Sequence, residues 1–188
     1  MIVHADAVAA QPWRNGGGQT RELLAWPAGD AWRVRISRAD IDRDGPFSAF
    51  PQVQRWFAVL QGAGVVLQFA DGERTVRPGD EALAFDGAAA PGCRLIDGPT
   101  QDLNLMLRGM QGALQAWRAG QDGPPGGALR ALYTTVAGHW QCGPQSQWLD
   151  AHALLWSADS RPTDAWQFTP ALPPAPGAIW WISAQPQD

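Results

Sequence analysis

The chain has 188 residues, a formal net charge of −4, and 45% apolar against 17% charged residues. All 14 basic residues are Arg, only three residues are Glu, and Gly (21) and Pro (16) recur throughout, so long solvated helices have little room. This composition excludes a disordered chain, a helical bundle and an electrostatic nucleic-acid binder.

Alternating and apolar segments predict short strands along the whole chain. Trp32–Ser37 alternates apolar and polar residues, which places Arg33, Arg35 and Ser37 on one face. Trp56–Leu60 and Val65–Phe69 flank a glycine-containing turn and predict a hairpin. Further strands are expected at Arg74–Arg77, Cys93–Ile96, Asp102–Leu107, Leu129–Val136, Gln147–Trp156, Ala165–Phe168 and Ala178–Ser183.

One short helix is predicted, at Gly112–Ala119, and Gln121–Gly127 is expected to be a linker. Even spacing of strands between Gly and Pro residues is typical of a β-sandwich or barrel. We therefore expect an all-β chain with a first barrel over residues 1–108, a linker with a short helix over 109–127, and a second half over 128–188. The two halves are expected to form one compact unit in which strands can be shared.

Polar residues concentrate in the first half, so a ligand site is expected there. Arg33 and Arg55 lie in or beside strands; an inward-facing Arg is unfavourable unless it meets an acid or an anionic ligand, and the alternative is a solvated outward face. Asp102 and Asn104 share one strand face, where Asn104 either recognises a ligand or bonds to the backbone. Asn15 precedes Gly16–Gly18, which is either an anion-facing loop or an ordinary turn.

The chain lacks sequence signals for a metal, a membrane or secretion. The three histidines, at positions 4, 139 and 152, have no metal-ligand spacing, so no metal or cofactor is predicted. No apolar stretch approaches the roughly 20 residues of a spanning helix, and the N-terminus has no basic segment followed by an apolar one. We expect a cytoplasmic protein without membrane or nucleic-acid partners, and a homodimer stays open.

Several motifs of the first half resemble, in their order, those of the HutD/Ves family. The resemblance covers residues 1–108 and implies a cupin-type, jelly-roll-like β-barrel, as a bicupin whose second barrel is degenerate. It also implies a regulatory link to histidine utilisation with no established catalytic activity, although the Ves relatives imply a stress response instead. The motifs are Pro12–Glu22, Trp32–Val34, Asp44–Pro51, Arg55 ahead of Val59–Gly62, Asp97–Pro99 and Asp102–Met106.

Metal-binding cupins carry two histidines and a glutamate in their first motif. In this chain Arg55 falls where that glutamate is expected, seven residues before Gly62, and Pro51 and Val53 occupy the region of the histidines. Replacing a carboxylate by Arg turns a cation site into a candidate anion site. The comparison therefore favours a metal-independent cupin that recognises a carboxylate.

The leading hypothesis is a small carboxylate ligand of the urocanate, formiminoglutamate or formylglutamate class. Arg55 and Arg33 are expected to clamp the carboxylate beside Asp102. Directed hydrogen bonds are expected from Asn15, Thr20 and Asn104, and an apolar wall from Trp13 and Phe47. Two alternatives stay open: an enzyme that uses Asp86, Asp102 or Glu22, and a protein-interaction module with a vestigial pocket.

Overall fold

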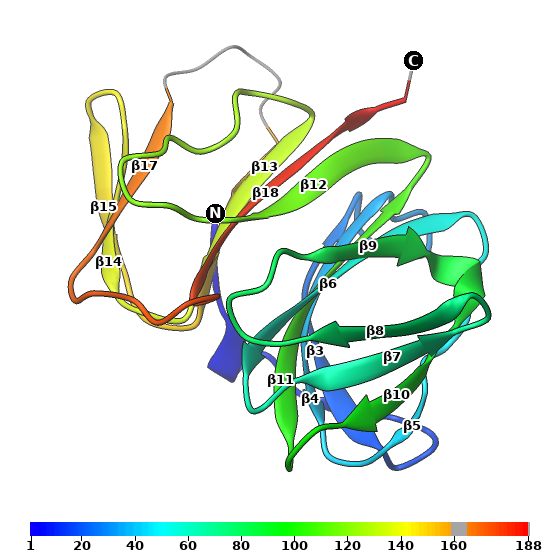
Figure 1. Cartoon of the computed structure of the whole chain (residues 1–188). Coiled ribbons are helices and arrows are strands. Elements are labelled where there is room, and N and C mark those ends of the chain that lie inside the picture. Colours follow the sequence, from blue (N-terminus) through cyan, green and yellow to red (C-terminus); the bar gives the residue numbers. More distant parts are fainter. Residues whose placement is uncertain (159–164, 188) are drawn as a thin grey trace.

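A computed structural model describes residues 1–158 and 165–187 (Figure 1). The fold is all-β and cupin-type, as predicted. In the described ranges the helices are two short 3₁₀ turns, η1 (Ala5–Ala7) and η2 (Gly87–Ala89). Four antiparallel sheets form two barrels, with the first barrel and the smaller second one at opposite ends of the molecule in Figure 1.

The first barrel is built from a six-stranded and a four-stranded sheet. Its buried interior includes Ile41, Phe57, Val65, Leu67 and Cys93. The six-stranded sheet has the order β2 (Gln11–Pro12), β3 (Gly18–Trp26), β4 (Val34–Ile41), β11 (Thr100–Arg108), β6 (Val53–Gln61) and β9 (Leu83–Asp86). The four-stranded sheet has the order β5 (Gly45–Pro46), β10 (Gly92–Leu95), β7 (Val65–Phe69) and β8 (Gly72–Val76).

The second barrel combines a five-stranded and a three-stranded sheet. Its interior is packed by large side chains, among them Trp140, Trp166, Phe168 and Trp181. The five-stranded sheet has the order β1 (Ile2–His4), β16 (Ala153–Ser157), β13 (Leu129–Thr134), β18 (Ile179–Pro186) and β12 (Met110–Ala116). The three-stranded sheet has the order β15 (Gln145–Leu149), β14 (Gly138–Cys142) and β17 (Trp166–Pro170).

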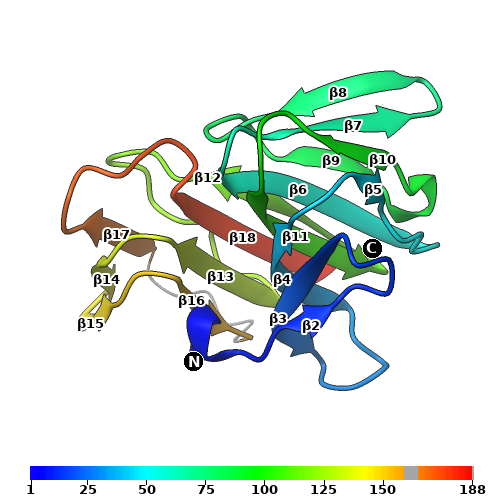
Figure 2. The same cartoon turned by 90° about the horizontal axis from the view of Figure 1, so that it is seen from below.

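The two barrels are joined by the outer faces of their larger sheets. Leu103 and Leu105 of β11 are fully buried there, in one cluster with Tyr133 of β13 and Trp180 of β18. Figure 2 shows β13 and β18 lying beside β4 and β11. Because strands alternate their side chains, the apolar face of β11 forms this junction while its other face looks into the first barrel.

Two sequence predictions, one in the expected linker and one in the second half, are wrong. The helix expected at Gly112–Ala119 is replaced by β12, which pairs residue by residue with β18 and brings Gly112 against the Ser183 carbonyl. Tertiary pairing outweighs the weak propensity of such a short helix. The single strand expected at Gln147–Trp156 is two strands, β15 and β16, because the chain turns at His152 (φ 58°).

Other expectations are confirmed with small shifts at the ends of strands. β7 has the predicted bounds, and β4, β6, β10 and β11 overlap their predicted segments. The first strand, β1, pairs with β16 and so belongs to the five-stranded sheet of the second barrel.

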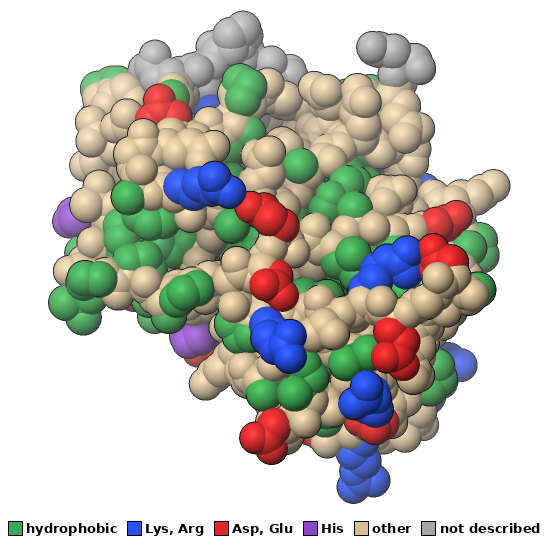
Figure 3. Space-filling model, in the orientation of Figure 1, with side chains coloured by type: hydrophobic (Ala, Val, Ile, Leu, Met, Phe, Trp, Pro, Cys, Tyr) green, Lys and Arg blue, Asp and Glu red, His purple; other side chains and the backbone are tan. Residues whose placement is uncertain are grey.

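The described residues include no helix that is long and apolar enough to cross a membrane. On the face seen in Figure 3, arginine and acidic side chains are interspersed over the first barrel. Two exposed ion pairs have this character, Arg74–Asp71 at 2.7 Å and Arg118–Glu81 at 2.9 Å.

Candidate functional site

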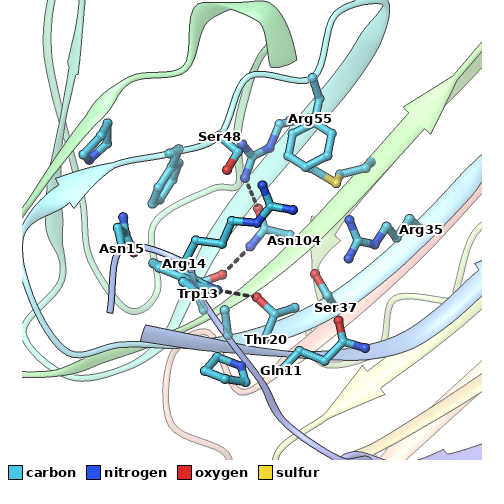
Figure 4. A pocket seen from close by; sticks show the side chains of 17 residues that line it. Gln11, Trp13, Arg14, Asn15, Thr20, Arg35, Ser37, Ser48, Arg55 and Asn104 are labelled. Carbon is cyan, nitrogen blue, oxygen red and sulfur yellow. Dashed lines mark hydrogen bonds between the residues drawn. The ribbon is translucent and has the colours of Figure 1, made fainter. Parts of the chain in front are cut away.

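A cavity of about 720 Å³ opens into the first barrel (Figure 4). Its wall is formed by inward-facing residues of β3, β4, β6 and β11, together with the segments Gln11–Asn15 and Pro46–Phe50. Three adjacent strands set the positions by register: Met106 of β11 lies between Arg35 of β4 and Arg55 of β6. One step along the strands, Asn104 lies beside Ser37, and Asp102 then lies beside Ala39.

Arg55 is the most enclosed cation of the cavity, with 5% of its surface exposed. Its Nη2 donates to Asn104 Oδ1 at 2.8 Å. The guanidinium lies 5.1 to 5.7 Å from the ring centres of Phe47, Phe50 and Phe85. Within the described ranges, no group accepts a hydrogen bond from its buried Nε and Nη1. The protein therefore holds a guanidinium in an aromatic setting and leaves part of its donor capacity unused.

Asn104 connects Arg55 to Asp102. Its Nδ2 donates to Asp102 Oδ1, and the Asp102 side chain is buried, with 1% exposed. Burial raises the pKa of the Asp102 carboxyl well above its usual value, while the charge of Arg55 opposes the shift. Burial also lowers the pKa of Arg55 to about 10, with Asp102 opposing and Arg35 adding to the shift. The three side chains thus form one buried polar network.

Arg35 is the second strand-borne cation of the cavity. Its Nε donates to Glu22 Oε2 on β3 at 2.6 Å, and 19% of its side chain is exposed. Arg14 lies on the exposed segment before Gly16 and points into the cavity in Figure 4. Three arginines therefore face the cavity from three different segments.

Two further contacts order the mouth of the cavity. Trp13 Nε1 donates to Thr20 Oγ1 at 2.7 Å, which ties the first segment to β3 (Figure 4). The Gly17 amide donates to Asn15 Oδ1 at 3.0 Å, so Asn15 makes the ordinary side-chain turn that was the alternative to an anion-facing loop. The Trp13 ring packs edge-on to Phe47, with ring centres 6.5 Å apart.

The structure brings seven of the eight predicted site residues to this one cavity. Arg33 is the exception: it is exposed, lies just before β4 and donates from Nη2 to the Gly109 carbonyl oxygen at 2.5 Å. The expected clamp of Arg33 with Arg55 is therefore wrong, because β4 begins at Val34 and Arg33 belongs to the hairpin end outside the barrel. The residues at the cavity are Trp13, Asn15, Thr20, Phe47, Arg55, Asp102 and Asn104.

Sequence reasoning missed several lining residues. The two-residue period of the strands could have identified three of them. Arg35 and Ser37 share a predicted face, and Met106 follows Asn104 on the same face of β11. Phe50 lies in a loop, where no such period exists.

The lining side chains do not fit a metal. All three histidines lie outside the cavity wall, and Asp102 is its one carboxylate. Across residues 1–158 and 165–187, no cluster of three His, Cys, Asp or Glu could hold a metal ion. Of the acids considered for catalysis, Glu22 bonds Arg35 and Asp86 caps η2 through the Ala88 amide, so Asp102 alone lines the cavity.

The HutD family model matches residues 5–170 of the chain. An uncharacterised 21.2 kDa protein in the hutC 3′ region of Pseudomonas putida is 38% identical over 110 residues, a match that spans 56% of this chain and only 57% of that protein. Protein Ves of Cronobacter sakazakii is 31% identical over 130 residues, covering 69% of this chain and 72% of that one. The solved structure of HutD from Pseudomonas fluorescens SBW25, from a formate condition, superposes with a TM-score of 0.82 at 25% identity and covers 100% of this chain and 99% of its own. The family match spans most of the chain, and the relatives agree with the motifs of the first half: the chain belongs to the HutD/Ves family.

Proposed function

We propose that the first barrel binds a small carboxylate metabolite without a metal and that this binding regulates histidine utilisation. The observation that carries the proposal is Arg55: a guanidinium with 5% exposure, lining a cavity, with two nitrogens that lack acceptors in the described chain. A buried cation with unused donors is costly, and a carboxylate supplies both the charge and the acceptors.

The surroundings of Arg55 support this choice of ligand. Asn104 holds one edge of the guanidinium, and the nearby phenylalanine rings restrict its orientation. A fixed, planar donor group suits a planar carboxylate. The HutD structure from Pseudomonas fluorescens was obtained in a formate condition, and formate is the smallest carboxylate.

The link to histidine utilisation rests on relatives. One is encoded in the hutC 3′ region of Pseudomonas putida, and another is named HutD. We therefore select the ligand class from carboxylates of histidine breakdown: urocanate, formiminoglutamate and formylglutamate.

Isothermal titration of the purified chain with these three compounds, and with histidine and glutamate, tests the proposal. At least one is expected to bind with a Kd below about 1 mM, and Arg55→Gln is expected to weaken it by about 30-fold or more. Arg130→Gln, which replaces the buried arginine of the second barrel, is the matched control and should leave the affinity unchanged. Absence of sub-millimolar binding by every compound would contradict the proposal.

An enzyme is the second candidate, because Asp102 is a buried carboxyl with a raised pKa beside a cavity. Incubation of each compound with the purified chain, followed by mass spectrometry, separates the two functions. Product that disappears in Asp102→Asn, while binding persists, would favour the enzyme.

A further inference from the structure

Arg35 repeats the arrangement of Arg55 on the opposite side of Met106. Both side chains face the cavity, and each is anchored through one nitrogen: Arg55 through Nη2 to Asn104, and Arg35 through Nε to Glu22. The Arg35–Glu22 contact leaves the Nη1 and Nη2 groups of Arg35 without a hydrogen-bond acceptor among the described residues. A guanidinium has five N–H donors, so anchoring one nitrogen does not exhaust it.

The sheet fixes the separation of the two arginines. They lie on β4 and β6, which flank β11, and Met106 pairs with both. Neighbouring strands are about 4.8 Å apart, so the two backbones lie roughly 10 Å apart. A ligand with a carboxylate at each end of a short carbon chain matches two cationic side chains that start from strands this far apart.

The charge of the cavity differs from that of the rest of the chain. The chain as a whole carries −4, yet the ionisable side chains of the wall are Arg14, Arg35, Arg55 and one aspartate. Outside the cavity, Arg74 and Arg118 are paired with acids. Glu22 reduces the charge at Arg35 but does not line the cavity. An excess of cations at an enclosed wall favours a dianion over a monoanion.

Resting on the proposed function, we infer that the ligand is an acyclic dicarboxylate, with one carboxylate at Arg55 and the other at Arg35. The volume of about 720 Å³ accommodates a ligand well beyond the size of a single carboxylate. Met106 lies between the two arginines and faces the carbon chain of the ligand, which suits its apolar, adaptable side chain. The assignment makes Arg35 a specificity residue that distinguishes dicarboxylates from monocarboxylates.

Titration with glutarate and valerate tests the inference, because these probes differ only in the second carboxylate. The wild-type chain is expected to bind glutarate at least about tenfold more tightly than valerate. Arg35→Gln should bring the ratio of the two affinities close to one, and Arg35→Lys should restore part of it by returning the charge. Arg74→Gln, on the opposite sheet and paired with Asp71, is the control and should keep the wild-type ratio. Thermal unfolding of each variant checks that it is folded.

The outcomes separate this inference from the proposed function. Equal wild-type affinities for glutarate and valerate overturn the dicarboxylate assignment and leave carboxylate binding in place. Loss of the preference in Arg14→Gln but not in Arg35→Gln overturns the role of Arg35. Tighter binding of glycerol 3-phosphate than of any dicarboxylate overturns the ligand class. If neither probe binds but urocanate does, the inference fails and the proposed function stands; if no carboxylate binds, both fail.

Discussion

The interiors of the two barrels are filled differently. In the first, the inner face of the larger sheet carries Arg35, Arg55 and Asp102, and a cavity remains. In the second, the corresponding interior is filled by Trp166 and Trp181. The closeness of that packing is visible at Gly123, where a Cβ would meet the Trp181 ring at 2.9 Å.

The difference between the two interiors assigns stability and the proposed binding to different barrels. Large buried aromatic side chains contribute strongly to the free energy of folding. Buried Arg55 and Asp102 instead carry a desolvation penalty, which the network through Asn104 only partly offsets. The packed interior of the second barrel stabilises the chain, while the first barrel keeps an unfavourable polar interior, as the proposed ligand binding requires.

The largest expected effect tests the second barrel. Trp181→Ala should lower the free energy of unfolding by about 3–5 kcal/mol, because the side chain is 1% exposed and its loss leaves a cavity. Trp148→Ala, at a position with 46% exposure, should change it by less than about 0.5 kcal/mol. Denaturant unfolding measures both. A Trp181→Ala chain that keeps its stability but loses carboxylate binding would reverse the assignment of roles.

Enlarging one inner-face residue in each barrel gives the next contrast. Ser37→Leu projects into the cavity and should weaken carboxylate binding by about 30-fold or more, with a stability change below about 1 kcal/mol. Ala153→Leu, at a fully buried position of the second barrel, should cost about 1–3 kcal/mol by overpacking and leave affinity intact. Titration measures the carboxylate affinity of both variants, and denaturant unfolding measures their stability. Equal changes in affinity and in stability for the two variants would argue against a functional cavity.

Affinity should depend on pH in a way specific to the first barrel. Because the pKa of Asp102 is raised, the carboxyl is neutral at low pH and becomes a negative charge beside the ligand as pH rises. Carboxylate affinity should therefore fall as pH increases through the Asp102 pKa, by up to about tenfold, and fall again near the Arg55 pKa of about 10. Arg35 and Asp40 are the other charges that act on this pair. Titrations from acidic to alkaline pH measure the profile, and Asp102→Asn should flatten its lower part. A profile that stays unchanged in Asp102→Asn would exclude this origin.

The smallest effect concerns the mouth of the cavity. Trp13→Phe removes the hydrogen bond to Thr20 and should lower the free energy of unfolding by about 1 kcal/mol. A double-mutant cycle with Thr20→Val isolates the pair. Strictly additive losses would show that the contact does not couple these residues.

Much of the first barrel could be predicted from the sequence because its strands alternate cleanly. The same alternation placed Asp102 and Asn104 on one face, and the ordered motifs identified Arg55. The prediction for Arg33 was wrong because a two-residue period gives the face of a strand but not the residue at which the strand begins. The register across β4, β11 and β6, which sets Arg35 against Arg55, depends on contacts between distant segments.

The second half was harder to predict. β12 has no strong alternation, and its strand conformation comes from pairing with β18, some 70 residues away in the sequence. The sequence did not indicate that large aromatic side chains fill one barrel while the other stays open. That distinction depends on which strand face each residue occupies.

The most direct test of the central claim observes Arg55 and Arg130, one buried arginine from each barrel, together. In a nitrogen-labelled sample, the Nε–Hε signals of Arg55 and Arg130 can be assigned by their loss in Arg55→Gln and Arg130→Gln. Addition of glutarate is predicted to shift the Arg55 signal in a saturable way and to leave the Arg130 signal in place. A saturable shift of Arg130, or an Arg55 signal that does not move while ligand binds, would contradict the account.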